Sequence, residues 1–184
     1  MNILVTGSNG QLGSEIKDLE AHFTDFKFFF MDLPDLDICN NSQLDVFFKD
    51  KNINTVINCA AYTAVDKAEQ DSEIAKKVNS TGVFNLVNAL EKVGGKLIHI
   101  STDYVFDGKK QKPYDEDDET RPLNNYGKSK RAGELAILKA LPCNGIIIRT
   151  SSLYSEFGDN FVKKILRLGS LESELNIVAD QYSS

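Results

Sequence analysis

The sequence predicts an α/β fold in which helices cover both faces of a doubly wound parallel sheet. Short apolar runs rich in Ile, Val and Phe alternate with longer segments of helical periodicity. A glycine-rich turn follows the first apolar run. Connections between parallel strands are almost always right-handed, so these units wind into an open, Rossmann-like sheet. Ligands of such sheets bind beyond the carboxyl ends of the strands.

Each element follows from its local pattern. The expected strands are residues 2–6, 27–31, 55–58, 96–101 and 145–149, with a short further strand at 175–178. The expected helices are residues 11–21, 42–51, 72–92, 125–141 and 160–168. Asn79 lies inside one of these helices at a cost in propensity, which indicates a packing or polar-network role. The charged stretch 109–119 is interpreted as a solvated surface loop in preference to a binding lid.

Length and charge limit the function classes. The chain has 184 residues and a net charge of −6, which fits one domain and disfavours binding to nucleic acid or anionic lipid. No apolar run could span a bilayer and no secretory signal begins the chain, so we expect no membrane association and a cytoplasmic protein. Cys39, Cys59 and Cys143 lack metal-ligand spacing and are expected to be reduced, mostly buried thiols, with no metal site. His99, in an apolar run, is expected in the core.

The first strand leads into TGSNGQLG, with glycines at three-residue intervals before a helix. Gly7 permits the tight turn, Gly10 allows the backbone to approach a pyrophosphate, and Gly13 allows close packing of the helix. The helix N-terminus can then bind the anion, with the amides of Gln11 and Leu12 best placed to donate. The turn therefore predicts a dinucleotide site, the alternative being a purely structural turn.

Residues at later strand ends extend this prediction. Asp32 ends the second strand, where a carboxylate can accept from a ribose hydroxyl; this favours NADH over NADPH, a weak preference because lysines lie nearby. Asp37 and Ile38 could flank an adenine, although Asp37 could equally be a helix-entry residue. The small residues Ala60 and Ala61 would let a dinucleotide lie against the end of the third strand.

A candidate proton donor lies in NNYGKSKRAGE. Tyr126 and Lys130 are four residues apart on an expected helix and share a face. A neighbouring ammonium would lower the pKa of the phenol towards working pH and make Tyr126 a usable general acid. Ser101 and Thr102 end the fourth strand, where Thr102 could hydrogen-bond a substrate carbonyl. The combination is more specific than any one motif.

The segments NILVTGSNGQLG, INCAAYTAVDKAE, STDYVFDG, PLNNYGKSKRAGE and IIIRTSSLY resemble the extended short-chain dehydrogenase/reductase family, and most of all its reductases of nucleotide-linked keto sugars. The resemblance implies hydride transfer from NADPH or NADH to the C4 ketone of dTDP-4-dehydro-6-deoxy-L-mannose, giving dTDP-L-rhamnose, with Tyr126 as proton donor. It implies cofactor contacts from Gly10, Gln11, Leu12, Asp32, Asp37, Ile38, Ala61, Tyr62, Thr63, Tyr126 and Lys130. It implies substrate contacts from Thr102, Asp103 and Val65. A homodimer and an interfacial magnesium ion are implied by the resemblance alone.

Two departures from this family qualify the prediction. Ser152 stands where these reductases usually have a tryptophan. The family also continues for about a hundred further residues, a typical lobe size. We therefore expect residues 1–184 to form a single NAD(P)-binding domain that lacks a C-terminal substrate lobe.

Two alternatives remain open. One is a non-catalytic regulatory subunit that binds a dinucleotide; the presence of Thr102, Tyr126 and Lys130 together favours catalysis over it. The other is a different nucleotide-sugar reductase, epimerase or dehydratase of the same family. An epimerase or dehydratase would show no net oxidation of the cofactor.

Overall fold

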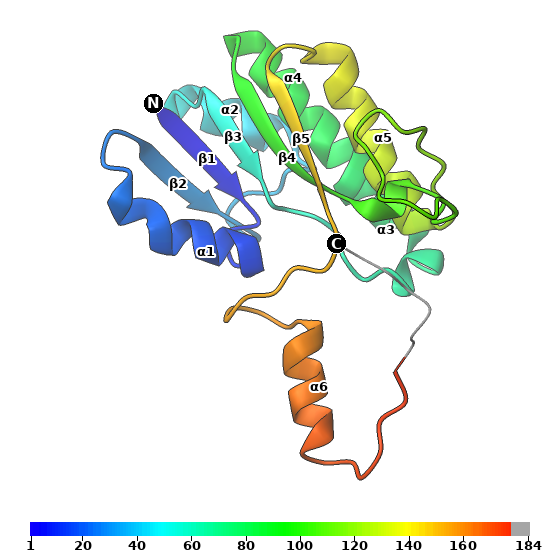
Figure 1. Cartoon of the computed structure of the whole chain (residues 1–184). Helices are drawn as coiled ribbons and strands as arrows, with labels where there is room; N and C mark the ends of the chain where they lie inside the picture. The colour runs from blue at the N-terminus through cyan, green and yellow to red at the C-terminus, as the bar shows by residue number, and fades with distance from the viewer. Residues whose placement is uncertain (178–184) are drawn as a thin grey trace.

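The structure is a computed structural model that describes residues 1–177. Within this range five strands form one parallel sheet in the order β2-β1-β3-β4-β5 (Figure 1). The strands are β1 (Asn2–Thr6), β2 (Lys27–Met31), β3 (Thr55–Asn58), β4 (Lys96–Thr102) and β5 (Gly145–Thr150). The chain leaves β1 towards β2 on one side and returns to β3 on the other. The switch point of the winding therefore lies between β1 and β3.

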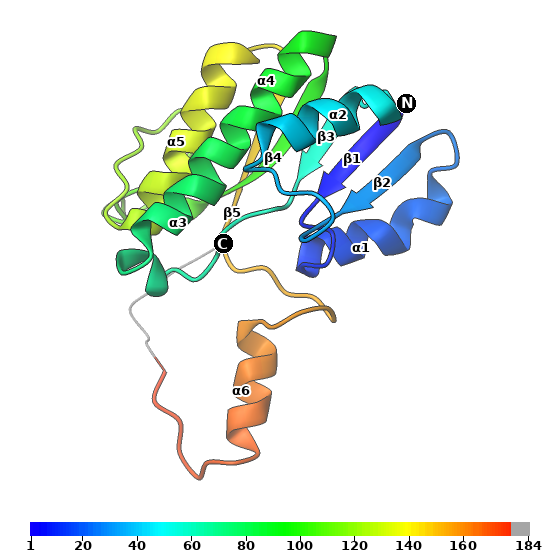
Figure 2. The same cartoon turned by 180° about the vertical axis from the view of Figure 1, so that it is seen from behind.

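Helices lie on both faces of this sheet, as predicted. The helices α2 (Asn41–Lys51), α4 (Val83–Val93) and α5 (Asn125–Ala140) lie side by side on one face (Figure 2). On the opposite face α1 (Gln11–Leu19) lies near β1 and β2 (Figure 1). The doubly wound α/β fold class is thus confirmed.

The main core lies between the sheet and the three-helix layer. Leu4, Val56 and Leu97 project from the central strands and meet Leu86 and Leu90 of α4, all fully buried. A continuous apolar layer of this kind is the chief source of folding free energy in such domains.

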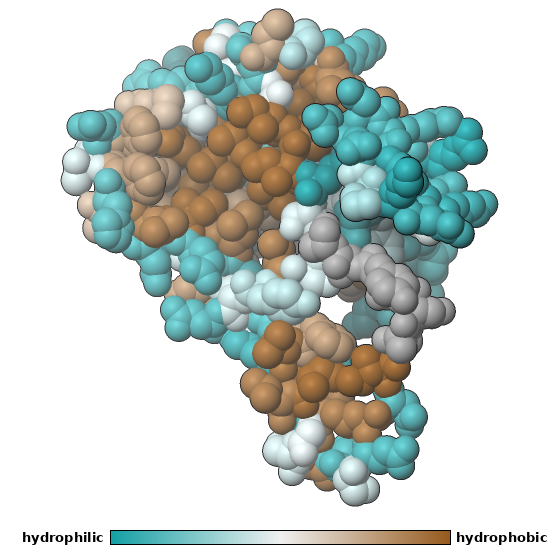
Figure 3. Space-filling view, in the orientation of Figure 1, coloured by the Kyte–Doolittle hydropathy of each residue, from teal (hydrophilic) through white to brown (hydrophobic). Residues whose placement is uncertain are grey.

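The other face is less covered at β5. Ile147 packs against the main core, whereas its neighbours Ile146 and Ile148 are exposed, as alternation along a strand requires. A wide apolar area is visible over the sheet and another over α6 (Phe161–Gly169), which extends away from the sheet (Figures 1 and 3).

The structure corrects three expectations. The helix predicted at 72–92 is divided into α3 (Ser72–Lys76), a π-helical turn η3 (Lys77–Gly82) and α4. The strand predicted at 175–178 is wrong for residues 175–177, which pair with no strand; Val178 lies outside the described residues. All three cysteines are free, but Cys143 is exposed and the other two are only partly buried.

Shorter elements complete the chain. Single 3₁₀ turns form η1 (Glu20–His22), η2 (Lys67–Glu69) and η4 (Asp103–Val105). No described helix combines the length and apolarity that a membrane crossing would require.

Candidate active site

A cavity of about 710 Å³ opens at the carboxyl edge of the sheet. It brings together the glycine turn after β1 and the ends of β3, β4 and β5. The predicted residues that line it are Gly7, Gly10, Gln11, Leu12, Gly13, Asp32, Asp37, Ile38, Ala60, Ala61, Tyr62, Thr63, Thr102, Tyr126 and Lys130. Residues that the sequence placed in three different motifs thus share one site.

Two predicted substrate contacts do not line this cavity. Val65 packs in a small second cluster with Ala68, Ala75 and Tyr126. Asp103 accepts a hydrogen bond from the Thr102 hydroxyl at 3.0 Å. Val65 thus lies in the same cluster as Tyr126 and Asp103 beside Thr102, but neither residue forms part of the described cavity wall.

The glycine turn is tight because the backbones of two strand ends meet there. Gly7 has a φ of +65°, and a Cβ on it would lie 2.6 Å from the Ala60 nitrogen. A Cβ on Gly13 would lie 2.5 Å from the Gly7 oxygen. Neither position accepts a side chain without a shift of backbone. This confirms the tight turn predicted at Gly7, whereas Gly13 packs against the turn residues Gly7 and Ser8 and not against a strand.

We predict that Gly7→Ala destabilises the chain by about 1–3 kcal/mol more than Gly108→Ala, the range typical of overpacking. Gly108 is a matched control because its φ is +69° and nothing lies within 4 Å of a Cβ there. Both variants therefore share the left-handed strain, and only Gly7→Ala adds the collision with Ala60. Urea unfolding measures the two free energies; equal losses would contradict the crowding.

Aspartates at the turn are already held by backbone groups. Asp32 accepts hydrogen bonds from the amides of Asn9 at 3.0 Å and Leu33 at 2.8 Å. Asp37 accepts from the amide of Cys39 at 2.8 Å, while Asn40 is the N-cap of α2. The helix-entry interpretation of Asp37 is therefore wrong.

The segment after β3 is fixed by the π turn. Asn79 is fully buried and its side chain accepts from the Tyr62 amide at 2.8 Å and donates to the Tyr62 carbonyl at 3.0 Å. It also donates to the Ser129 hydroxyl of α5 at 3.0 Å. The predicted polar-network role of Asn79 is confirmed. Because π turns widen a helix locally, this one accounts for the break in the expected helix.

Helix α5 carries Tyr126 at its first turn. Asn124 caps the helix by accepting from the Gly127 amide at 2.7 Å. A Cβ on Gly127 would lie 2.2 Å from the Tyr104 carbonyl, so a glycine lets the helix start close to η4. The Tyr126 ring then packs edge-on against Tyr104 at 5.6 Å between centroids.

The electrostatics of this pair differ from the prediction. Burial raises the pKa of Tyr126, a rise that a hydrogen bond with Thr102 opposes and the Asp103 carboxylate increases. Burial lowers the pKa of Lys130 to about 8. The lysine donates to the Ile100 carbonyl at 2.6 Å. The expected lowering of the Tyr126 pKa by Lys130 is therefore wrong: Tyr126 is a neutral phenol, the form that a proton donor needs.

A buried carboxylate ties α5 to two strands. Glu134 has no exposed surface and accepts from Ser101 at 2.6 Å and from Arg149 Nε and Nη2, both at 2.9 Å. Arg131 donates to it at 2.8 Å. Burial disfavours the ionised form, but the hydrogen bonds outweigh burial and lower the pKa of Glu134. Ser101 is thereby held beside Thr102.

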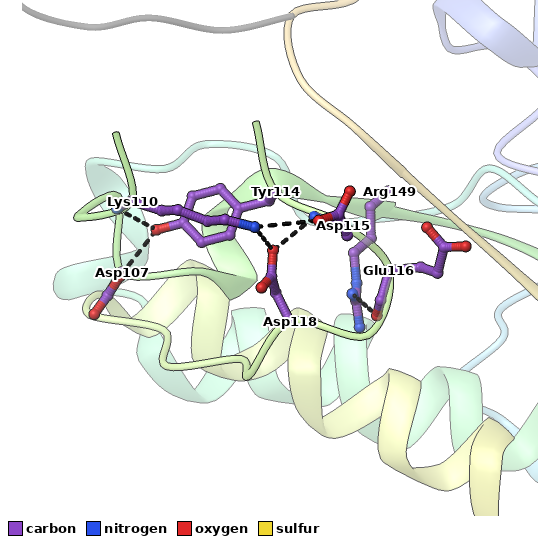
Figure 4. Close-up of polar contacts among 7 residues, drawn as sticks. All are labelled: Asp107, Lys110, Tyr114, Asp115, Glu116, Asp118 and Arg149. Atoms are coloured by element: carbon purple, nitrogen blue, oxygen red, sulfur yellow. Dashed lines mark hydrogen bonds and ion pairs between the residues drawn. The ribbon is translucent and has the colours of Figure 1, made fainter. Parts of the chain in front are cut away.

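The charged loop 109–119 folds on its own polar contacts (Figure 4). Lys110 bonds the carboxylates of Asp115 and Asp118, and the Tyr114 hydroxyl donates to Asp107 at 2.9 Å. Arg149 donates to the Glu116 carbonyl at 3.2 Å and so joins the loop to β5. None of residues 109–119 lines the cavity, which favours a surface loop over a lid.

Further lining residues were not predicted. Leu36, Cys39 and Val78 add apolar surface beside Ile38. Thr150, Ser151, Leu153, Gly158 and Asp159 line the cavity after β5. The rule that ligands bind at strand carboxyl ends, applied to the fifth strand, could have found the second group. Ser152, between two of them, is exposed and does not line the cavity.

The family comparison decides the classification. The protein-family model described as the RmlD substrate binding domain matches residues 1–184 of the chain. The chain belongs to this family. Among known proteins, this RmlD-family chain is 45% identical over 181 residues to a dTDP-4-dehydrorhamnose reductase of Sinorhizobium fredii, covering 98% of the chain and 60% of that protein. It is 39% identical over 188 residues to the enzyme of that name from Escherichia coli K12, covering 100% of the chain and 62% of that protein.

Solved structures agree with this classification. A dTDP-4-dehydrorhamnose reductase of Clostridium acetobutylicum superposes on the RmlD-family chain with a TM-score of 0.93 and 46% identity, covering 98% of the chain and 64% of that structure. The enzyme of that name from Bacillus anthracis, solved in complex with NADP, superposes with a TM-score of 0.93 and 40% identity, covering 98% and 63%. The RmlD-family chain thus spans about 60% of the length of its curated relatives.

Proposed function

We propose that these 184 residues carry the cofactor site and the proton donor of a dTDP-4-dehydrorhamnose reductase. The reaction is reduction of the C4 ketone of dTDP-4-dehydro-6-deoxy-L-mannose to dTDP-L-rhamnose by NADPH or NADH. The observation that carries this proposal is the single cavity shared by the glycine turn, Thr102, Tyr126 and Lys130. The relatives of the same name, of which the chain spans about 60%, support it.

The residues present fit a dinucleotide. Gly7 and Gly13 leave no room for a side chain, so the backbone itself forms the cavity wall. Among the described residues no side chain caps α1 at Gly10, which leaves the first-turn amides of Gln11 and Leu12 available to an anion. Leu36 and Ile38 offer an apolar surface suited to an adenine ring. A bound nicotinamide would supply the hydride.

The chain's own groups supply the rest of the chemistry. Thr102 would orient the substrate carbonyl, and the neutral phenol of Tyr126 would donate its proton to the ketone oxygen as negative charge develops there. Lys130 would position the cofactor by hydrogen bonding. Asp103 and Val65, which lie beside Thr102 and Tyr126 but outside the described cavity wall, would contact the sugar.

The choice between the two cofactors rests on Asp32. A carboxylate at that position disfavours a 2'-phosphate, so we propose a preference for NADH, although the Bacillus anthracis relative was solved with NADP. We also propose the homodimer that the resemblance implies.

The test measures cofactor consumption with the chain completed to the length of its relatives. We expect one NAD(P)H oxidised for each dTDP-4-keto sugar reduced, with the greater kcat/KM for NADH. Sugar conversion without net oxidation would indicate an epimerase or dehydratase. Dinucleotide binding without any conversion would indicate a regulatory subunit.

A further inference from the structure

Four buried polar side chains form a row, three of them on neighbouring strands and the fourth on α5. Thr6 of β1 is in register with Asn58 of β3, and Asn58 is in register with His99 of β4. The Thr6 Oγ1 to Asn58 Oδ1 distance is 2.7 Å, and Asn58 Nδ2 lies 2.9 Å from His99 Nδ1. His99 Nε2 lies 3.4 Å from Lys130 Nζ. His99 is fully buried, as predicted, but it has a polar partner on each ring nitrogen.

The charge of Lys130 determines which ring nitrogen of His99 carries hydrogen. Burial, together with the Lys130 charge, lowers the pKa of His99 well below its ordinary value, so the ring is neutral and only one nitrogen bears hydrogen. A charged Lys130 can only donate, so Nε2 must then accept and Nδ1–H must donate to Asn58. This requires the amide oxygen of Asn58 to face His99 and its nitrogen to face Thr6.

In the structure the Asn58 amide has the opposite orientation, with its oxygen towards Thr6 and its nitrogen towards His99. Thr6 donates to the Asn58 oxygen, and the Asn58 nitrogen donates to His99 Nδ1. The ring hydrogen is then on Nε2, which suits a neutral Lys130 amine as acceptor. Because the oxygen and nitrogen of an amide exchange places on a half-turn of the group, the two arrangements need no change in heavy-atom spacing.

We propose that His99 is a positioning residue that acts through Lys130, and that the row from Lys130 to Thr6 reverses its hydrogen-bond direction when the lysine changes charge. This inference rests on the proposed function for its role in turnover. Thr6 lines the cavity, so the charge of Lys130 decides whether the Thr6 hydroxyl can donate to a group bound there.

The other groups around Lys130 are the same in every His99 variant, so they cannot cause a difference in the Lys130 pKa between those variants. The Glu134 carboxylate raises the pKa of Lys130, though less than burial lowers it. The neighbouring Cys59 is a neutral thiol, because burial raises its pKa to about 12. The Ile100 carbonyl accepts from the ammonium irrespective of the ring. His99 differs from these groups because the hydrogen of its neutral ring can lie on either nitrogen.

The first test needs neither cofactor nor substrate. The chain has two histidines, so ¹⁵N-histidine labelling gives one ring for His99 and one for the exposed His22, an internal reference. We expect the Nδ1–H tautomer of His99 at pH 6.5 and conversion to Nε2–H with a midpoint near pH 8, where Lys130 titrates. In Lys130→Met the conversion should be lost. A His99 tautomer that does not change between pH 6.5 and 9.5 in the parent chain would overturn the proposal.

The second test separates a positioning role from a structural one, with the chain completed to its relatives' length. His99→Leu should shift the pH profile of kcat by about one pH unit to lower pH, the effect of losing a hydrogen bond to a charged group. His99→Gln keeps an acceptor and should restore most of the profile. Activity in His99→Leu with an unshifted profile would contradict the role. Failure of ketone reduction in the parent would sink the proposed function alone, since the tautomer measurement stands without it.

Discussion

Tyr126→Phe should lower kcat for ketone reduction about 100- to 10,000-fold, the contribution of a positioned general acid. The substitution removes only the hydroxyl. The ring keeps its edge-on contact with Tyr104 and its place beside Ala68 and Ala75. Dinucleotide affinity should therefore be nearly unchanged, because the glycine turn and Lys130 remain. Steady-state rates and fluorescence titration of the cofactor measure the two quantities in the completed protein.

Tyr104→Phe is the matched control for this experiment. It removes the hydroxyl of the other ring of the same aromatic pair, and Tyr104 is exposed and does not line the cavity. We expect its rate to stay close to that of the parent. A Tyr126→Phe variant that retains the parent rate would remove Tyr126 as proton donor.

Glu134→Ala should lower the free energy of unfolding by about 3–5 kcal/mol, the loss found when one partner of a buried ion pair is removed. The change leaves Arg149 and Arg131 without the carboxylate and Ser101 without its acceptor. It also removes the hydrogen bonds by which Glu134 joins α5 to Ser101 of β4 and Arg149 of β5. Urea unfolding at pH 7 measures the loss.

Two controls define the cause of that loss. Glu91→Ala removes a glutamate from an exposed helical position and should cost far less. Glu134→Gln keeps hydrogen-bonding atoms but removes the charge, so it should be intermediate. Since the folded pKa of Glu134 is lowered, its ionic contribution is present above the unfolded pKa of about 4.3 and lost as pH falls through the folded value. The gap between parent and Glu134→Gln should thus narrow in acid; a gap that widens there would contradict the ionic account.

Local patterns predicted the sheet and the location of the site well. The apolar runs predicted the bounds of all five strands of the sheet within one residue. The glycine spacing predicted the turn, and the close contacts in that turn explain why residue 7 is a glycine. These features depend on near neighbours in the chain. The rule that parallel strands end at one edge placed Thr102 at the cavity, and the four-residue spacing from Lys130 identified Tyr126 in the following helix.

Long-range partners set what the patterns missed. The four-residue spacing of Tyr126 and Lys130 predicted a shared face but not that the Lys130 amine would donate to the Ile100 carbonyl. The break in the helix at 77–82 depends on Asn79 reaching the backbone of Tyr62, seventeen residues away in sequence. Exposure of Cys143, in the turn before β5, likewise depends on tertiary packing.

The contact between Gly7 and the backbone of Ala60 has a thermodynamic consequence for recognition. Together with the two hydrogen bonds between the Asn79 side chain and the Tyr62 backbone, it holds two parts of the cavity wall in place through contacts within the protein. A binding site that is already ordered loses little conformational entropy when a ligand binds, so more of the interaction energy contributes to affinity. Substitutions that remove either set of contacts should therefore weaken ligand binding chiefly by raising the dissociation rate constant.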